Sequence, residues 1–257
     1  TSPRFRLEPG AYYLLSHHTL SQVQKGGNDH RVGQVADKPS DQGNHEKSQF
    51  GVTILLANSC HGSHGYRHRA KAKAGMPHGC CQEAWILEHP EVLIELQCSY
   101  SKAGSEIIYA PTFQANPLAL GRHGLEADMT SINARLIALS RKAAPNKLIA
   151  GNLTTLRAYM DISAESNLEH MTHIYRTQIH ALVQGGTDLL AAETLLHPLE
   201  AQAILHAAKE EGASTVMISF ALKPDGTLRS GHNAESVFAE LEQAGAAALG
   251  INCIAAD

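Results

Sequence analysis

The sequence predicts an α/β protein in which parallel strands alternate with helices. From Trp85 onward, short apolar runs alternate with segments of helical periodicity. The strands are nearly continuous apolar runs, as is typical of parallel strands covered by helices. Several of them end in polar or reactive residues: Thr112, Asn152, Glu193 and Cys253. Because the carboxyl ends of the strands form the active face of a (β/α)8 barrel, we favour this TIM-type barrel.

A Rossmann-type sheet has the same rhythm of strands and helices. It is the weaker alternative, because no G-x-G-x-x-G motif follows the first predicted strand. A nucleotide-binding test would distinguish the two folds.

The N-terminal segment, residues 1–50, differs from the rest of the chain. Most of it is polar and rich in Gly and Asp, with neither helical nor strand periodicity. Such a composition buries too little apolar surface to offset the entropy lost on ordering. We therefore predict a disordered or loosely packed segment over 1–50 and a barrel domain over 51–257.

Six strands are expected in the barrel domain. The first is the apolar run VTILLAN, and the others follow at intervals that leave room for a helix. The predicted strands lie near residues 53–57, 106–112, 147–152, 188–194, 215–221 and 248–254.

The intervening helices have clear start and stop signals. Pro90 begins the first, Gly104 follows it, and Val92, Leu96 and Tyr100 share one face. The second helix has an apolar face of Ile132, Leu136 and Leu139, and the third has one of Ile174, Ile179 and Leu182. The fourth helix begins at Pro198 and ends before Gly212. Asn233 is the expected N-cap of the fifth.

Composition excludes several classes of protein. The formal net charge of −4 gives no electrostatic case for binding nucleic acid. No apolar run approaches the roughly 20 residues of a membrane helix. The five cysteines are an odd number in a chain of this size, so we expect no disulfide framework and a reducing, cytoplasmic location.

Four motifs resemble the homocysteine S-methyltransferase (homocysteine-binding) domain family, in the order and spacing of that family. They are WILEHPEVLIELQCSYSKAGSEIIYAPTFQANPLAL, GGTDLLAAETL, VMISFALKPDGTLRSG and GINC. The resemblance covers roughly residues 75–257. The form YAPTF, where many members have Asn-Thr-Phe, most resembles the homocysteine-binding module of cobalamin-dependent methionine synthase.

The resemblance implies zinc-dependent methyl transfer to the sulfur of homocysteine, giving methionine. Only a thiolate is a good nucleophile, and zinc bound to the substrate sulfur would lower its pKa. Three cysteine thiolates hold the zinc in this family, and the substrate takes the open fourth position. The first ligand corresponds to Cys253, for which a buried small apolar residue is the alternative. The other two ligands are an adjacent Cys-Cys pair on a later strand. The sequence ends before such a pair, so we expect about six βα units and an incomplete metal site.

The resemblance also implies substrate-binding residues. Glu193 corresponds to the residue that binds the amino group of homocysteine; an internal salt bridge or a helix-cap contact is the alternative. Asn252 is expected to orient the substrate or to bond to a neighbouring loop. Thr112 and Asn116 are expected to line the pocket, with loop hydrogen bonding as an equal alternative.

Asn152 and Thr154, which follow the third strand, have the same two interpretations as Thr112 and Asn116. The pair Cys80-Cys81 precedes the first predicted helix and does not lie on a late strand, so we interpret it as incidental. Cys98 is interpreted as a packing residue.

A histidine cluster could bind metal only adventitiously, because Gly62 and Gly65 disfavour the helix that would align its members. It consists of His61, His64, His68 and His78.

Two other functions stay open. One is a catalytically inactive fragment. The other is a binding module that partners a corrinoid protein and keeps the pocket without the metal. The methyl donor also stays open among S-methylmethionine, a sulfonium cofactor, betaine and methylcobalamin, and the acceptor could be another thiol.

Overall fold

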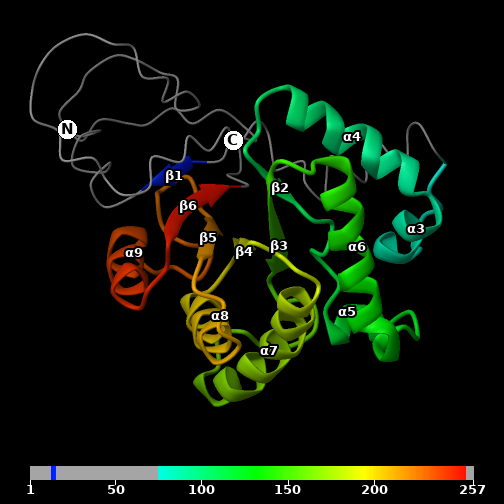
Figure 1. Ribbon diagram of the computed structural model, residues 1–257. Coiled ribbons are helices and arrows are strands. Elements are labelled where there is room, and N and C mark those ends of the chain that lie inside the picture. The colour runs from blue at the N-terminus through cyan, green and yellow to red at the C-terminus, as the bar shows by residue number, and fades with distance from the viewer. Residues whose placement is uncertain (1–12, 16–74, 253–257) are drawn as a thin grey trace, which may run out of the picture.

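The computed structural model describes residues 13–15 and 75–252 (Figure 1). In this part of the chain, six strands form one sheet in the order β1-β6-β5-β4-β3-β2. Strands β2 to β6 pair in parallel, and β1 pairs antiparallel with β6. The strands are β1 (Tyr13–Leu15), β2 (Ile107–Tyr109), β3 (Leu148–Thr154), β4 (Leu189–Leu195), β5 (Val216–Ala221) and β6 (Ala248–Asn252).

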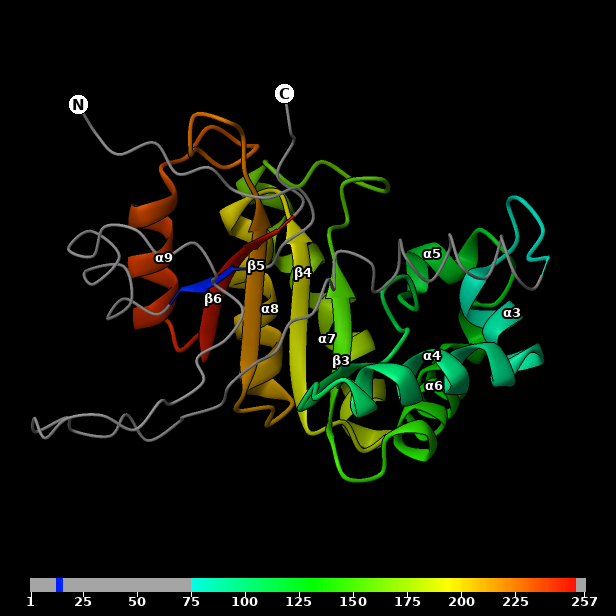
Figure 2. The ribbon, with the colours of Figure 1, turned by 90° about the horizontal axis from the view of Figure 1, so that it is seen from above.

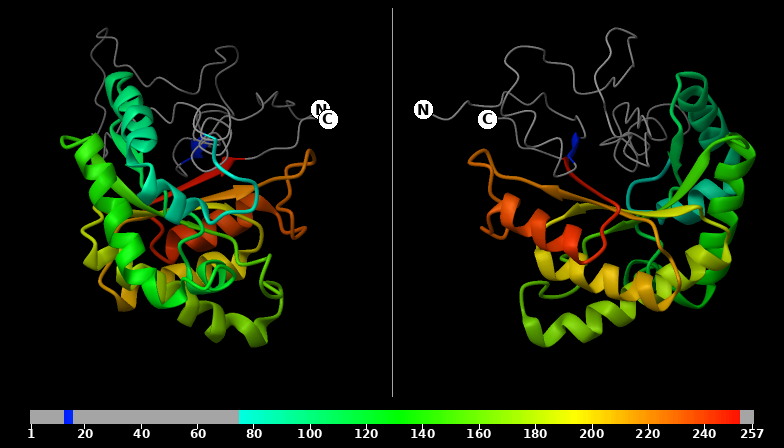
Figure 3. Two further views of the ribbon diagram at one scale, coloured as in Figure 1. Left: turned by 90° about the vertical axis from the view of Figure 1, so that its right-hand side faces the viewer. Right: turned by 60° about the vertical axis from the view of Figure 1, so that its left-hand side comes forward.

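The helices lie along the outer face of this curved sheet. Figure 2 shows β3 to β6 side by side, and Figure 3 shows the later helices on one face of the sheet. The α-helices are α3 (Gln82–Glu88), α4 (Pro90–Lys102), α5 (Pro117–Gly121), α6 (Met129–Ala143), α7 (Leu168–Gln184), α8 (Pro198–Glu210) and α9 (Ala234–Gln243). Two short 3-10 helices are η2 (Glu126–Asp128) and η3 (Glu165–Asn167). The result is a half-barrel of parallel strands with a helix after each of β2 to β5, which confirms a partial TIM-type barrel.

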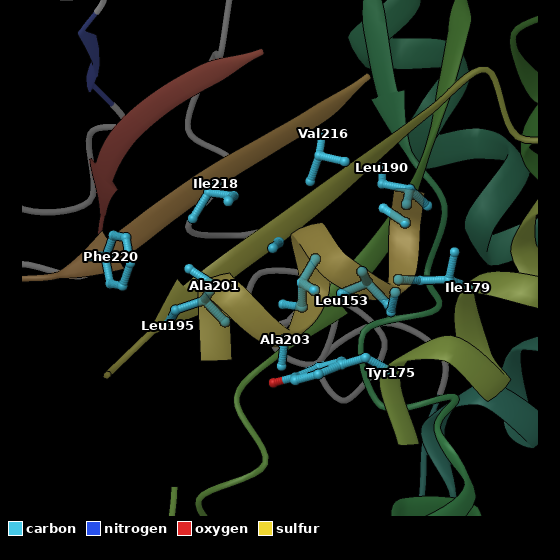
Figure 4. Packing of buried hydrophobic residues seen from close by; sticks show 14 of the residues in the cluster. Leu153, Tyr175, Ile179, Leu190, Leu195, Ala201, Ala203, Val216, Ile218 and Phe220 are labelled. Atoms are coloured by element: carbon cyan, nitrogen blue, oxygen red, sulfur yellow. The ribbon is translucent and has the colours of Figure 1, made fainter. Parts of the chain in front are cut away.

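Side chains of the parallel strands alternate between two buried clusters, as the period of two in a strand requires. Leu153, Leu190 and Ile218 face the helices and pack with Tyr175 and Ile179 of α7 (Figure 4). The alternate residues form the second cluster on the other face: Ile107, Ala150, Leu189, Ala191 and Met217. Burial on both faces explains why the strands read as continuous apolar runs.

Five of the six predicted strands are confirmed, as β2 to β6. The one expected near 53–57 lies outside the described residues. Strand β1 was not among the predictions. With three residues, it is too short to produce a periodic pattern.

All five predicted helices are present, as α4, α6, α7, α8 and α9. In α4, Leu93 and Leu96 are the buried apolar residues, whereas Val92 and Tyr100 are only partly buried. Gly104, the predicted stop, follows α4 with a φ of 102°, which an L side chain rarely adopts. Helices α3 and α5 were missed, because seven and five residues are too few to show helical periodicity.

The predicted cap of α9 is also present. The side chain of Asn233 accepts a hydrogen bond of 2.9 Å from the backbone N–H of Ser236. No helix in the described part of the chain is long and apolar enough to cross a membrane.

Candidate functional site

Three predicted site residues meet at the carboxyl edge of the sheet. The hydroxyl of Thr112, just beyond β2, donates to the Asn152 carbonyl at 2.9 Å and accepts from the Asn152 backbone N–H at 2.8 Å. Asn152 Nδ2 donates in turn to Glu193 Oε2 at 2.8 Å. The exposures of Thr112, Asn152 and Glu193 are 0%, 2% and 3%. Three neighbouring strand ends are thus joined by buried polar side chains.

One acceptor in this network is unsatisfied. Asn152 Oδ1 is buried and accepts no hydrogen bond from any described residue. A buried acceptor without a donor costs about 1–3 kcal/mol. Asn152 Oδ1 belongs to the same side-chain amide whose Nδ2 contacts the carboxylate of Glu193. An amide oxygen and a carboxylate together suit a donor with several N–H groups, such as an ammonium group.

Strand β4 is distorted where it carries Glu193. The register with β5 shifts between Ala192 and Leu195. Within this bulge Thr194 has a φ of 61°. A positive φ is uncommon for a β-branched residue, and bulges near active sites commonly re-aim a side chain. The irregular stretch therefore sets the direction of Glu193.

Asn252, the last residue of β6, contacts this bulge. Its Nδ2 donates to the hydroxyl of Thr194 at 2.6 Å. Strand β5 lies between β6 and β4, so this bond crosses the end of β5. The strand ends therefore converge as in a barrel, and the structure brings Asn252 to the site formed by Thr112, Asn152 and Glu193.

Thr154 and Asn116 have structural contacts. The hydroxyl of Thr154 donates to the Glu193 carbonyl at 3.2 Å and links β3 to β4. Asn116 Oδ1 accepts from the Ala119 N–H at 2.9 Å and caps α5. The Asn116 contact agrees with the loop-bonding interpretation, whereas the Thr154 contact joins two strands. Substrate contacts of both residues stay predictions.

Polar residues on the helices fix the loop after β2. Gln178 of α7 donates to the Thr112 carbonyl at 2.8 Å, and Asn133 of α6 donates to the Ala115 carbonyl at 2.8 Å. Glu83 of α3 accepts from the Gln114 N–H at 3.2 Å. None of these three contacts was predicted from the sequence. The signal was a polar residue in phase with an apolar helix face, as Gln178 is with Tyr175 and Leu182.

The described cysteines do not form a metal site. Cys81 donates to Glu83 Oε2 at 3.7 Å, and burial raises the pKa of its thiol, which disfavours the thiolate that a metal needs. Cys98 donates to the Ala143 carbonyl at 3.1 Å. Among residues 75–252, no three His, Cys, Asp or Glu side chains are grouped to hold a metal ion.

The predicted zinc ligand, Cys253, lies outside the described residues. So do three members of the histidine cluster: His61, His64 and His68. The described residues therefore do not supply a zinc site.

Comparisons with known proteins give a consistent result. A family model described as homocysteine S-methyltransferase matches residues 54–257. The homocysteine S-methyltransferase of Escherichia coli is 30% identical over an alignment of 190 residues, and the match covers 66% of this chain and 61% of that protein. Betaine–homocysteine S-methyltransferase 1 of Danio rerio is 28% identical over 170 residues, 65% of this chain and 41% of that protein. The chain thus spans less than two thirds of the length of these relatives.

A solved structure is similar over most of the described fold. The metallated form of the homocysteine methyltransferase MmuM from Escherichia coli superposes with a TM-score of 0.65 at 27% identity. The match covers 74% of this chain and 73% of that one. None of the relatives named here is a cobalamin-dependent methionine synthase. The particular resemblance to the homocysteine-binding module of that enzyme therefore stays a prediction.

Proposed function

This chain belongs to the homocysteine S-methyltransferase family, and we propose that it transfers a methyl group to the sulfur of homocysteine, or of a related thiol, giving methionine. The proposal rests on one observation at the carboxyl edge of the sheet. Glu193 and Asn152 are buried side by side, and Asn152 Oδ1 lacks a donor among the described residues.

The amino group of an amino-acid substrate fits this pair. It carries three N–H donors and a positive charge, which complement the carboxylate of Glu193 and the oxygen of Asn152. Hydrogen bonds to charged groups contribute about 1.5–3 kcal/mol. Burial excludes competing water, and a held amino end limits the positions that the sulfur can take. Restricting the sulfur in this way favours in-line attack on a methyl carbon.

A zinc ion is expected from the family resemblance. Zinc, when bound, would supply a sulfur of lowered pKa. Residues 75–252 do not themselves form a site for this metal. Cys253 as a ligand stays a prediction, and elemental analysis of the full chain beside Cys253→Ala tests it. About one zinc per chain, lost in the variant, would support Cys253; equal metal content in both would contradict it.

The methyl donor, the corrinoid partner, the cytoplasmic location and the division at residue 50 also stay predictions.

A turnover assay decides among the functions. The full chain is incubated with homocysteine and, in separate reactions, S-methylmethionine, betaine or methylcobalamin, and methionine is quantified. Methionine formation that Glu193→Gln reduces at least about tenfold at limiting homocysteine would support the proposal. Homocysteine binding without turnover would favour the binding module, and neither binding nor turnover would favour an inactive fragment.

A further inference from the structure

A further buried acid, Glu200, joins two loops at the active edge of the sheet. It is the third residue of α8 and is 0% exposed. Its Oε1 accepts from the Leu156 N–H at 2.8 Å, and its Oε2 accepts from the Leu196 N–H at 3.2 Å. Leu156 follows β3 and Leu196 follows β4. One carboxylate therefore holds the loops after two neighbouring strands.

Tyr175 of α7 completes this arrangement. Its hydroxyl lies 3.1 Å from Glu200 Oε1 and 3.0 Å from the Thr154 carbonyl oxygen, and its single proton is donated to one of them at a time. Burial raises the pKa of Tyr175, so the hydroxyl stays a donor. Burial also raises the pKa of Glu200, while its hydrogen bonds to the backbone of Leu156 and Leu196 act in the opposite direction.

The loops held by Glu200 begin directly beyond the proposed amino-group site. Leu156 lies four residues after Asn152, and Leu196 lies three residues after Glu193. Other polar side chains of the helices, such as Gln178, contact the loop after one strand, whereas Glu200 contacts the loops after two.

We propose that Glu200 is a positioning residue for substrate: its carboxylate holds the ends of β3 and β4 together, and so keeps Asn152 and Glu193 aligned for an amino group. This inference rests on the proposed function of that pair.

A carboxylate is required because two N–H donors converge on the two oxygens of one group. In Glu200→Gln the volume is kept, but one oxygen becomes an NH₂ group that faces a donor. One loop must then lose its acceptor. Tyr175→Phe removes only the hydroxyl and leaves both N–H bonds in place. Glu210→Gln, an exposed position on the same helix, is the matched control.

Two measurements on the full-length chain test the inference. Amide hydrogen exchange in the unliganded protein reports on Leu156 and Leu196. Calorimetry gives the affinities for homocysteine and for 4-mercaptobutanoate, which is homocysteine without the amino group. For Glu200→Gln we expect faster exchange at Leu156 or Leu196 and about tenfold weaker binding of homocysteine, with little change for 4-mercaptobutanoate. We expect a smaller loss for Tyr175→Phe and none for Glu210→Gln.

The outcomes separate the two claims. Unchanged exchange at both amides in Glu200→Gln, or an equal loss of affinity for both ligands, would overturn the positioning role. If Glu200→Gln does not fold, Tyr175→Phe decides by the same ratio of affinities. An unsubstituted chain that binds no homocysteine would overturn the proposed function itself, and exchange at Leu156 and Leu196 would still show whether Glu200 holds the loops.

Discussion

The side-chain amide of Asn152 donates a hydrogen bond of 2.8 Å to the carboxylate of Glu193, and it joins the ends of adjacent parallel strands β3 and β4. The other end of the same amide, Oδ1, is buried and has no donor among the described residues. Asn152 therefore both orients the acid and presents an acceptor beside it. We propose that the Glu193 carboxylate and Asn152 Oδ1 together bind the amino group of the substrate.

Replacing Glu193 by Gln is expected to weaken homocysteine binding by about tenfold to a hundredfold, because a charge-assisted hydrogen bond becomes a neutral one. Calorimetric titration of the full chain measures the change. Glu240→Gln, an exposed acid on α9, serves as the control and should leave the affinity unchanged. Equal affinities of Glu193→Gln and the unsubstituted chain would exclude Glu193 from the site.

Thr112→Val is expected to destabilise the fold by about 1–3 kcal/mol. The valine keeps the shape of threonine but leaves the buried N–H and C=O groups of Asn152 without the hydroxyl. Thr112→Ser keeps the hydroxyl and should lose far less. Urea unfolding of both variants measures the difference, and similar stabilities would show that the hydroxyl contributes little.

Because Thr194 has a positive φ, we expect its glycine variant to be more stable than its alanine variant, the reverse of the usual order. Alanine and glycine both remove the hydroxyl that accepts from Asn252. At most positions the alanine variant is the more stable, because glycine loses more entropy on folding. At a φ of 61° glycine avoids a steric cost of about 1–2 kcal/mol. We therefore expect Thr194→Gly to unfold at higher urea concentration than Thr194→Ala, and the reverse order would mean that the bulge relaxes without strain.

We expect the free energy of unfolding to depend on pH through the titration of His197. Burial, and secondly the nearby His232, hold the pKa of His197 below its ordinary value of 6.5, while Asp161 opposes the shift. The unfolded chain therefore binds more protons than the native one just below pH 6.5, and the contribution of His197 to stability falls as pH falls through this window. His197 also caps α8 by accepting from the Leu199 N–H at 3.2 Å.

The variant His197→Asn separates the titration from the cap. Asparagine is a good N-cap and does not titrate. The free energy of unfolding of the variant should thus fall less than that of the unsubstituted chain between pH 7 and pH 5. Parallel pH profiles for the two proteins would show that His197 makes no contribution to this slope.

The sequence was informative wherever burial on both faces produced long apolar runs. Strands β2 to β6 follow from such runs, and the five longer helices follow from their periodicity and from start signals such as Pro198 at the first position of α8 and Asn233 at the N-cap of α9. The short elements α3, α5 and β1 lack a periodic signal. Helix α3 depends on the burial of Trp85 and Ile86 against later helices, which no local pattern reveals.

Four of the residues at this edge of the sheet were predicted from the sequence, and the side chains that support them were not. Thr112, Asn152, Glu193 and Asn252 were found because each lies at or just beyond the end of an apolar strand. Their pairing depends on strand order, which the sequence does not state. Glu200 and Gln178 were missed because each is one polar residue within an amphipathic helix. Their buried contacts exist only once the helices pack against the loops.

The most direct test of the account is a calorimetric comparison of two ligands on the unsubstituted full-length chain. Homocysteine and 4-mercaptobutanoate differ only in the amino group that Glu193 and Asn152 are proposed to hold. We predict that homocysteine binds at least about tenfold more tightly, because it gains one charge-assisted hydrogen bond. Equal affinities, or no binding of homocysteine, would contradict it.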